Sequence, residues 1–367
     1  MKVLWLTFIP SPYRLSFFEE LGKQCELTVL FERASSKIRK NNWDDYQFRG
    51  FEGKILLGLT IGGYDRLCPG VVKYLNRKYD RIVISNPTSP TGILAAGVLR
   101  AKGIPYMIES DGAFPTGRKG GIRQSIKRFV MKPAAICFST AELHDRYYGE
   151  CGVSMDCIRR YPFTSLGEAD IEDGCRLSQV EKSSLKNQLG MGEEVVILAV
   201  GQFVPRKGFD ILLEAMRYLP KYVGLYMIGD VPPEEYCRFV QDHHLDHVHF
   251  IGFQSKKGIA KYYAAADLFV LPTREDIWGL VINEAMAYGL PVITTDRCIA
   301  GLELVRNGEN GYIVPVGDAK QLAARIQDVL KNPNLRETMG QRSLEIIKTY
   351  TFENMCKVHM DVFSNGE

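Results

Sequence analysis

Short runs of β-branched and aromatic residues alternate with amphipathic segments of helical length, and this alternation constrains the fold more than any other feature of the chain. In the first part the runs occupy residues 3–9, 27–31, 81–85, 106–109 and 135–139. After a polar stretch over residues 165–184 the pattern restarts at residues 195–200, 224–228, 247–251, 268–271, 291–294 and 311–314. Strands that alternate with helices are typical of parallel α/β layers. The sequence therefore predicts an α/β fold of two doubly wound parallel sheets.

The polar stretch marks the predicted boundary between two domains. A chain of 367 residues with 46% hydrophobic content is long enough to bury a core in each. We expect a Rossmann-like N-terminal domain over residues 1–170 and a second Rossmann-like domain over residues 185–348. Apolar residues at helical spacing between Phe352 and Val362 predict a C-terminal helix, over residues 349–367, that crosses back to the first domain. An interdomain cleft is the expected ligand site.

Charge is distributed unevenly between these domains, although the net charge is only +3. Residues 1–170 hold 25 Lys and Arg against 17 Asp and Glu, a balance of +8, and residues 171–367 hold 21 against 26, a balance of −5. The first domain therefore suits an anionic partner, which is a membrane surface or a phosphate-bearing acceptor. We expect no nucleic acid partner.

Neither membrane spans nor disulfides are expected. No apolar stretch approaches the roughly 18 to 20 residues that cross a bilayer, and Pro10 and Pro12 interrupt the apolar start, which favours a buried strand over a signal peptide. Nine cysteines without a CxxC pair favour reduced thiols over disulfides or zinc. We expect a cytoplasmic protein that is soluble or peripheral on the inner face of the membrane.

The most informative motif lies in residues 272–292. Asp276 falls in a loop after an expected strand, Gly279 begins a helix, and Glu284 lies about one turn into that helix. Both carboxylates can then lie beside the same free backbone N–H groups, while glycine lets a phosphate approach the backbone closely. N–H groups at Gly279 and Leu280 would hold the phosphates of a sugar diphosphate, and the carboxylates would accept bonds from hydroxyls. The alternative is a solvated helix N-terminus whose acids only offset the helix dipole.

A second motif lies in residues 195–209, where a strand leads into a loop with Gly201, Arg206, Lys207 and Gly208. A basic side chain at this place can neutralise the charge that develops on a pyrophosphate leaving group. The alternative is a surface lysine in a turn.

With the two motifs in this order, about 70 residues apart in one α/β domain, the sequence resembles the family 4 glycosyltransferases. These are retaining enzymes with the GT-B fold of two Rossmann-like domains. Gly201, Lys207 and Gly208 match the glycine, the basic residue and the Lys-Gly of that family. Its acid-seven-residues-acid motif falls on Asp276 and Glu284.

The resemblance implies a role for each motif residue. Glu284 would bind the ribose, Asp276 the transferred sugar, and Lys207 with Arg206 the distal phosphate. Gly279 and Leu280 stand at the phosphate-binding positions, and Gly252 and Phe253 would lie near the base.

The sequence departs from the family pattern at three places. Gln202 stands where an arginine is common, so Arg206 would supply that charge. The first acid is Asp276 rather than glutamate, and the adjacent Glu275 leaves this role open between the two residues. On the acceptor side, the glycines that follow the first strand are replaced by a segment containing Ser11, Tyr13 and Arg14, and Asp111 stands where a histidine is expected.

The sequence therefore predicts a retaining hexosyltransferase-type enzyme of class EC 2.4. It would move a sugar from a nucleotide-sugar donor to a hydroxyl of a glycan, lipid-linked or small-molecule acceptor, in cell-surface polysaccharide or glycolipid assembly. No DxD triplet occurs, so we expect no metal and no cofactor. The histidines between His243 and His249 are expected to form a surface cluster.

Three other functions remain as alternatives. A nicotinamide-dependent oxidoreductase would also suit two parallel sheets, but neither first-strand loop contains GxGxxG. A sugar-nucleotide epimerase or a phosphorylase of the GT-B fold would use similar nucleotide or phosphate contacts. A catalytically inactive partner subunit that binds a nucleotide sugar is the third alternative.

A basic segment over residues 112–141 contains no acid. Its six cations are Arg118, Lys119, Arg123, Lys127, Arg128 and Lys132. Four apolar residues share one face of the expected helix, namely Ile122, Ile126, Phe129 and Val130. This pattern predicts either a stripe that packs on the first sheet or a helix that lies at an anionic membrane through residues 118–132.

Overall fold

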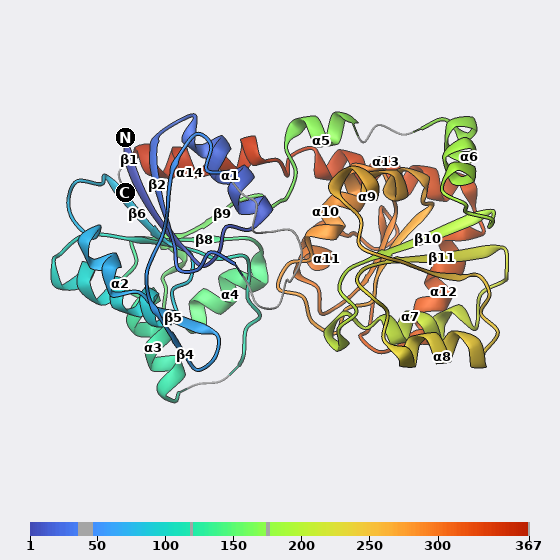
Figure 1. Cartoon of the computed structure of the whole chain (residues 1–367), viewed down its shortest axis with the longest axis horizontal. Coiled ribbons are helices and arrows are strands. Elements are labelled where there is room, and N and C mark those ends of the chain that lie inside the picture. Colours follow the sequence, from blue (N-terminus) through green and yellow to red (C-terminus); the bar gives the residue numbers. More distant parts are fainter. Residues whose placement is uncertain (36–46, 118–119, 174–176, 366–367) are drawn as a thin grey trace. The chain divides into compact units, whose positions relative to one another are not determined.

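The structure is a computed structural model, and it describes residues 1–35, 47–117, 120–173 and 177–365 (Figure 1). The chain forms two compact units. Unit 1 comprises Met1–Thr164 together with Phe352–Glu367, and unit 2 comprises Ser165–Thr351. Each unit is built on a parallel β-sheet, so the predicted fold class is confirmed.

Unit 1 contains a seven-stranded sheet with the order β3-β2-β1-β6-β7-β8-β9. The strands are β1 (Lys2–Thr7), β2 (Glu26–Phe31), β3 (Glu52–Ile55), β6 (Arg81–Ile84), β7 (Met107–Glu109), β8 (Ile136–Ser139) and β9 (Ile158–Arg160). An antiparallel hairpin of β4 (Leu59–Ile61) and β5 (Asp65–Leu67) lies outside this sheet. The sequence pattern located the five inner strands but missed β3 and β9, because these edge strands carry charged residues and lack a continuous apolar run.

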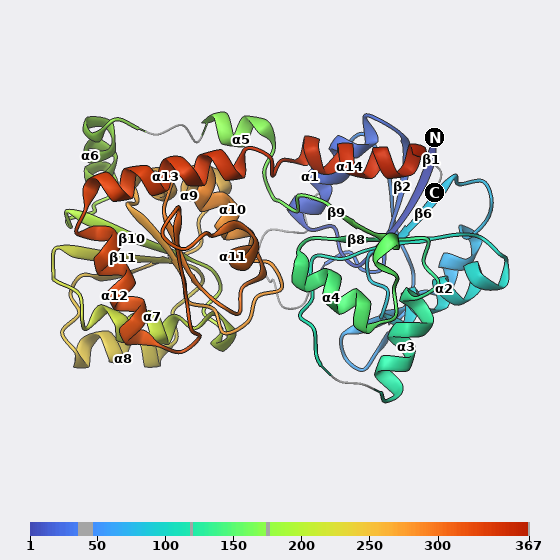
Figure 2. The same cartoon turned by 180° about the vertical axis from the view of Figure 1, so that it is seen from behind.

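Helices cover both faces of this sheet. They are α1 (Pro12–Gly22), α2 (Pro90–Ala101), α3 (Ile122–Met131), α4 (Glu142–Glu150) and α14 (Phe352–Asn365), with 3-10 turns η1 (Pro69–Lys73) and η2 (Met155–Cys157). Figures 1 and 2 show α1 and α14 on one face and α2, α3 and α4 on the other. Buried Trp5 contacts rings from both α1 and α14, including Phe17 and Phe363. The C-terminal helix therefore completes the core of unit 1.

Unit 2 contains a six-stranded sheet with the order β12-β11-β10-β13-β14-β15. The strands are β10 (Val195–Val200), β11 (Val223–Ile228), β12 (Val248–Ile251), β13 (Leu268–Leu271), β14 (Val292–Thr295) and β15 (Gly311–Val314). The strand order reverses between β10 and β13, and in such sheets ligands bind outside the carboxyl ends of the strands at the reversal. The loops after β10 and β13 are the two that carry the predicted motifs.

Helices also cover both faces of the second sheet. They are α5 (Glu168–Asp173), α6 (Gln179–Gln188), α7 (Phe209–Met216), α8 (Glu234–Asp242), α9 (Lys256–Ala265), α10 (Leu280–Ala287), α11 (Ile299–Leu304), α12 (Ala319–Leu330) and α13 (Pro333–Ile347), with a 3-10 turn η3 (Pro205–Lys207). Figures 1 and 2 show α7, α8 and α12 on one face, and α9, α10 and α13 on the other. The buried apolar residues of α7 and α12 form a core with β10, β11 and β13.

Within the described ranges, no helix combines the length and the apolar character needed to cross a bilayer. Eight cysteines in these ranges are free thiols.

Candidate active site

Two loops of unit 2 meet where its strand order reverses. The carbonyl oxygen of Arg206, in the turn after β10, accepts the backbone N–H of Arg274 at 2.7 Å and the hydroxyl of Thr273 at 2.8 Å. Gly208 has a φ of +66°, and a Cβ atom there would lie only 2.2 Å from the carbonyl oxygen of Pro272. Glycine is therefore required at this position by the backbone conformation and by the close approach of the second loop.

This contact brings together the basic residues of one motif and the first acid of the other. The Nζ atom of Lys207 lies 2.6 Å from Oδ2 of Asp276, and Nη1 of Arg206 lies 3.5 Å from the same oxygen. Lys207 is 8% exposed and Asp276 is 7% exposed. A buried carboxylate is stable only with such a partner. The site thus holds two cations against one acid, and it favours an additional anion.

The adjacent acid, Glu275, has a different partner. Its Oε2 atom lies 2.8 Å from Nη2 of Arg297, and both side chains are about half exposed. The sequence left the role of the first acid open between Glu275 and Asp276. In the structure Asp276 is the one that faces Lys207.

Helix α10 begins beside this pair. Its N-cap is Gly279, which adopts a left-handed conformation with a φ of +101°. A Cβ atom there would lie 2.9 Å from Sγ of Cys298 and 3.8 Å from Cγ of Asp276. Gly279 has no side chain that caps the helix, and Leu280 follows as its first residue. Helix N-termini without a side-chain cap are suited to phosphate oxygens, and Gly279 and Leu280 stand at such a terminus.

Glu284 does not share these N–H groups with Asp276, as the sequence had suggested. It is the fifth residue of α10, where its Oε2 accepts the hydroxyl of Tyr263 at 2.9 Å and its Oε1 accepts that of Ser165 at 3.2 Å. Burial raises the pKa of the Glu284 carboxyl, and the two hydroxyl donors only partly offset this effect. At this place about one turn into α10, the helix directs Glu284 toward Tyr263 of α9.

The remaining donor-side residues occupy ends of neighbouring strands. Gly201 follows β10 directly, and its carbonyl oxygen would lie 2.4 Å from a Cβ atom on Gly229, which follows β11. Gln202 is half-buried in the next position. Gly252 follows β12, and Phe253 beside it is 55% exposed. These residues lie at the carboxyl ends of the strands, as Lys207 does.

In unit 1 the structure brings three of the four acceptor-side residues together. Arg14 of α1 donates from Nη1 to Oε1 of Glu109 at 2.8 Å and from Nη2 to Oδ1 of Asp111. Tyr13 donates its hydroxyl to Oδ2 of Asp111 at 2.5 Å. Ser11 is buried as the N-cap of α1, but its side chain makes no capping bond.

Sequence reasoning missed the acid at the centre of this network. Glu109 is fully buried at the end of β7 and accepts bonds from Arg14, from the hydroxyl of Ser85 at 2.7 Å, and from Tyr161. Burial alone would raise the pKa of Glu109. The charge of Arg14 and these hydrogen bonds outweigh that effect, so the pKa lies below its ordinary value. The sequence feature that could have identified Glu109 is a carboxylate at the end of a buried strand. Asp111, with a side chain 30% exposed, is the member that a ligand can reach.

The predicted histidine cluster is only partly at the surface. His247 is 6% exposed, which corrects the prediction, whereas His249 lies 2.6 Å from Oε1 of Glu193 and is about one third exposed. Across the described parts of the chain, no three His, Cys, Asp or Glu side chains are grouped so that they could hold a metal ion.

The basic segment forms helix α3, but its apolar residues do not form one packed stripe. Val130 is buried and Ile126 is half-buried, whereas Ile122 is 82% exposed and Phe129 is 45% exposed. The packed face instead consists of Gln124, Val130 and Met131. Arg118 and Lys119 lie outside the described residues.

Comparisons with known proteins find similarity to glycosyltransferases. The family model of the group 1 glycosyl transferases matches residues 181–345. The chain is 27% identical over 293 residues to a phosphatidyl-myo-inositol mannosyltransferase of Mycobacterium leprae. The aligned region covers 78% of this chain and 73% of that protein. It is 34% identical over 238 residues to the lipopolysaccharide core biosynthesis glycosyltransferase LpsE of Rhizobium meliloti, covering 64% and 65% respectively.

Among solved structures, the complex of Anabaena HepE with UDP has a similar fold. It superposes with a TM-score of 0.80 over 100% of both chains, at 19% sequence identity.

Proposed function

This chain is a glycosyltransferase of the GT-B fold, and from that premise we propose that it is a retaining, family 4 enzyme that transfers a sugar from a nucleotide-sugar donor to an acceptor hydroxyl. The observation that carries the proposal is the group of Lys207, Arg206 and Asp276 beside the uncapped first turn of α10. The UDP complex named above supports a nucleoside diphosphate as the carrier of the sugar.

Lys207 and Arg206 would act on the leaving group. When the bond between the sugar and the diphosphate breaks, negative charge grows on the distal phosphate. Buried Lys207, with the half-exposed Arg206 beside it, is already positioned to stabilise that charge without reorganisation. The sequence has no DxD triplet to hold a divalent ion. We therefore propose that these side chains and the first-turn N–H groups of α10 stabilise the charge of the leaving diphosphate without a metal ion.

The two acids of the motif would hold hydroxyl groups of the donor. Asp276 holds Lys207 in place through their ion pair and would accept bonds from the transferred sugar once the phosphates engage the lysine. Glu284, oriented by Tyr263 and Ser165, would accept the ribose hydroxyls. The exposed ring of Phe253 would lie against the base.

Unit 1 would take the acceptor. Asp111 is held by Arg14 and Tyr13 and is the accessible acid of that network, so it is placed to accept a hydrogen bond from a hydroxyl. The names of the mannosyltransferase and of LpsE support an acceptor from glycolipid or cell-surface polysaccharide assembly. A lipid-linked acceptor also fits α3, where exposed Ile122 and Phe129 lie among basic residues that suit an anionic bilayer on the cytoplasmic side.

A panel of nucleotide sugars tests the proposal. Mass spectrometry should detect slow hydrolysis of one donor, and transfer to a matching acceptor should give a product whose anomeric proton has an α coupling in NMR. A β product would contradict retention if the donor is α-linked. Nucleotide binding without hydrolysis or transfer would favour the inactive partner subunit, and conversion of the donor to its epimer would favour the epimerase.

A further inference from the structure

A cavity opens in unit 2 at the amino-terminal ends of the strands. The candidate active site lies at their carboxyl ends, on the opposite side of the sheet. Asp267 and Pro291 line it and precede β13 and β14, whereas Asp276 and Gly279 follow β13 at its other end. The cavity volume is about 280 Å³, near the lower limit of roughly 300 Å³ for small-molecule sites. A sugar phosphate or a smaller metabolite is therefore the right size, and a nucleotide sugar is too large.

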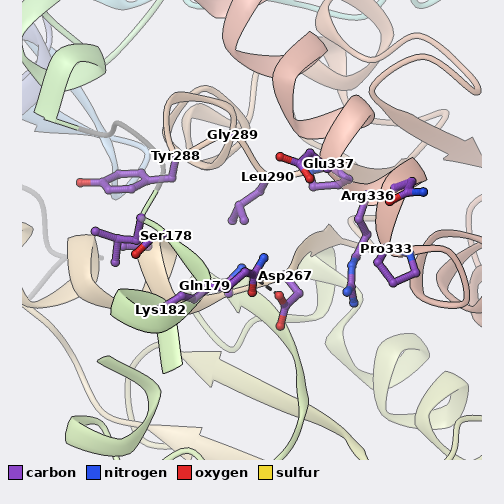
Figure 3. Close-up of a pocket in the computed structure, with 15 residues that line it drawn as sticks. Ser178, Gln179, Lys182, Asp267, Tyr288, Gly289, Leu290, Pro333, Arg336 and Glu337 are labelled. Carbon is purple, nitrogen blue, oxygen red and sulfur yellow. Dashed lines mark ion pairs between the residues drawn. The ribbon is translucent and has the colours of Figure 1, made fainter. Parts of the chain in front are cut away.

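Two lysines pair with one largely buried acid beside this cavity, and a third cation lies across it (Figure 3). Oδ1 of Asp267 lies 2.8 Å from Nζ of Lys182, and Oδ2 lies 2.7 Å from Nζ of Lys186. Oδ2 also accepts the backbone N–H of Val196 at 2.9 Å, so both oxygens of this carboxylate are already engaged. The third cation, Arg336, lies across the cavity from Lys182 (Figure 3). Its Nη1 atom is buried and finds no hydrogen-bond partner in the described structure.

The electrostatics of the cavity favour an anion. Burial lowers the pKa of Lys182, and the neighbouring charges of Lys186 and Arg336 lower it further against the opposite effect of Asp267. The other acid of the lining, Glu337, is exposed to solvent. A negative group between Lys182 and Arg336 would give the buried Nη1 its missing partner and reduce the repulsion between the cations.

We propose that this cavity binds a small phosphate monoester, with the phosphate between Lys182 and Arg336. A dianion matches two facing cations, and the planar guanidinium fits two phosphate oxygens. Figure 3 shows Gln179 beside Lys182, where its side-chain amide offers polar contacts to hydroxyl groups of the ligand. Leu290 and the proline rings of the lining would contact its carbon skeleton.

Isothermal titration calorimetry of the full chain with glycerol 3-phosphate, at constant ionic strength, tests this site. Because a phosphate group can also enter the proposed donor site, the titration is performed on the wild type and on Lys207→Ala. Binding should persist in Lys207→Ala and weaken at least about tenfold in Arg336→Gln, as expected for the loss of a charge-assisted bond. Binding that is lost in Lys207→Ala but kept in Arg336→Gln would place the ligand in the donor site and overturn the proposal.

Three further titrations sharpen the result. Ala264→Phe narrows the cavity from α9 without removing a charge, and it should also weaken binding. Lys320→Gln removes an exposed cation elsewhere in unit 2 and should leave the affinity unchanged; a loss equal to that in Arg336→Gln would indicate unspecific charge attraction and overturn the site. Inorganic phosphate should bind more weakly than glycerol 3-phosphate, because it lacks the carbon skeleton. Equal affinity for the two probes would overturn the assignment to a monoester.

Discussion

The Nζ atom of Lys207 lies 2.6 Å from Oδ2 of Asp276, although 69 residues separate them in the chain. Hydrogen bonds from the backbone N–H of Arg274 and the hydroxyl of Thr273 to the carbonyl oxygen of Arg206 hold the two loops together. The Lys207 cation is therefore desolvated and fixed in position by the protein, an arrangement that lowers the cost of stabilising charge in a transition state.

Replacing Lys207 by alanine should reduce kcat/KM for transfer by roughly a hundredfold or more, because one preorganised electrostatic contact is lost. Steady-state kinetics with the identified donor measures this, and circular dichroism checks that the variant folds. Lys320→Ala, an exposed cation of the same unit, is the matched control and should retain normal turnover. Near-normal activity in Lys207→Ala would remove this residue from the site.

Replacing Tyr263 by phenylalanine should raise the KM of the donor about fivefold with little change in kcat. The variant loses one hydrogen bond to Glu284, and such a bond contributes about 1 kcal/mol. Glu284→Ala should be more severe, lowering kcat/KM by roughly a hundredfold. Tyr262→Phe, one residue earlier in α9, serves as the control. If Tyr263→Phe and Tyr262→Phe behave alike, the hydroxyl of Tyr263 does not orient Glu284.

Transfer should survive EDTA, since the proposed leaving-group contacts are side chains and backbone N–H groups rather than a metal ion. The rate is measured after dialysis against EDTA and again after addition of manganese or magnesium. An absolute requirement for either ion would contradict the roles given to Lys207 and Arg206.

Replacing Glu32 by glutamine should stabilise unit 1 at pH 8 but not at pH 4.5. Oε1 of Glu32 accepts bonds from Ser89 and Asn86, while Oε2 is buried without a partner. Burial raises the pKa of Glu32 from 4.5 to about 7. The folded state thus holds a proton that the unfolded state releases, so the free energy of unfolding falls as the pH rises from 4.5 to 7.

The glutamine variant removes this pH-dependent loss, which amounts to about 3 kcal/mol above pH 7. Urea unfolding at several pH values measures the difference between the variant and the wild type. A difference that stays constant across this range would show that Glu32 does not titrate as described.

Anionic liposomes should sediment the protein in a salt-sensitive manner, and neutral liposomes should not. Ile122→Asp combined with Arg123→Glu should weaken this binding, because each basic charge near an anionic bilayer contributes about 1 kcal/mol. The effect should fade as the Debye length falls to about 8 Å at physiological ionic strength. Val180→Asp, at a residue 80% exposed in unit 2, is the matched control. Equal sedimentation with both lipid types would leave α3 as an ordinary surface helix.

Much of the fold could be predicted from the sequence, because the signals are local. Three strands of unit 2 have the predicted bounds, namely β10, β13 and β15, since a buried parallel strand is a short continuous apolar run. The motif loops follow from the same signal, as they lie directly after β10 and β13. Edge strands such as β3 and β9 were missed, because one side of each is open to solvent and their residues are polar.

The sequence by itself determined two doubly wound sheets and the two loops that carry the basic and acidic residues, because hydrophobic periodicity and glycine positions act over a few residues. Only the tertiary structure decided which acid faces Lys207, since Glu275 and Asp276 differ in burial and not in chemistry. It also decided that Glu109 organises Arg14 in unit 1 and that Ile122 remains exposed on α3. Burial and ion pairing depend on residues distant in the chain, and a local pattern contains no information about them.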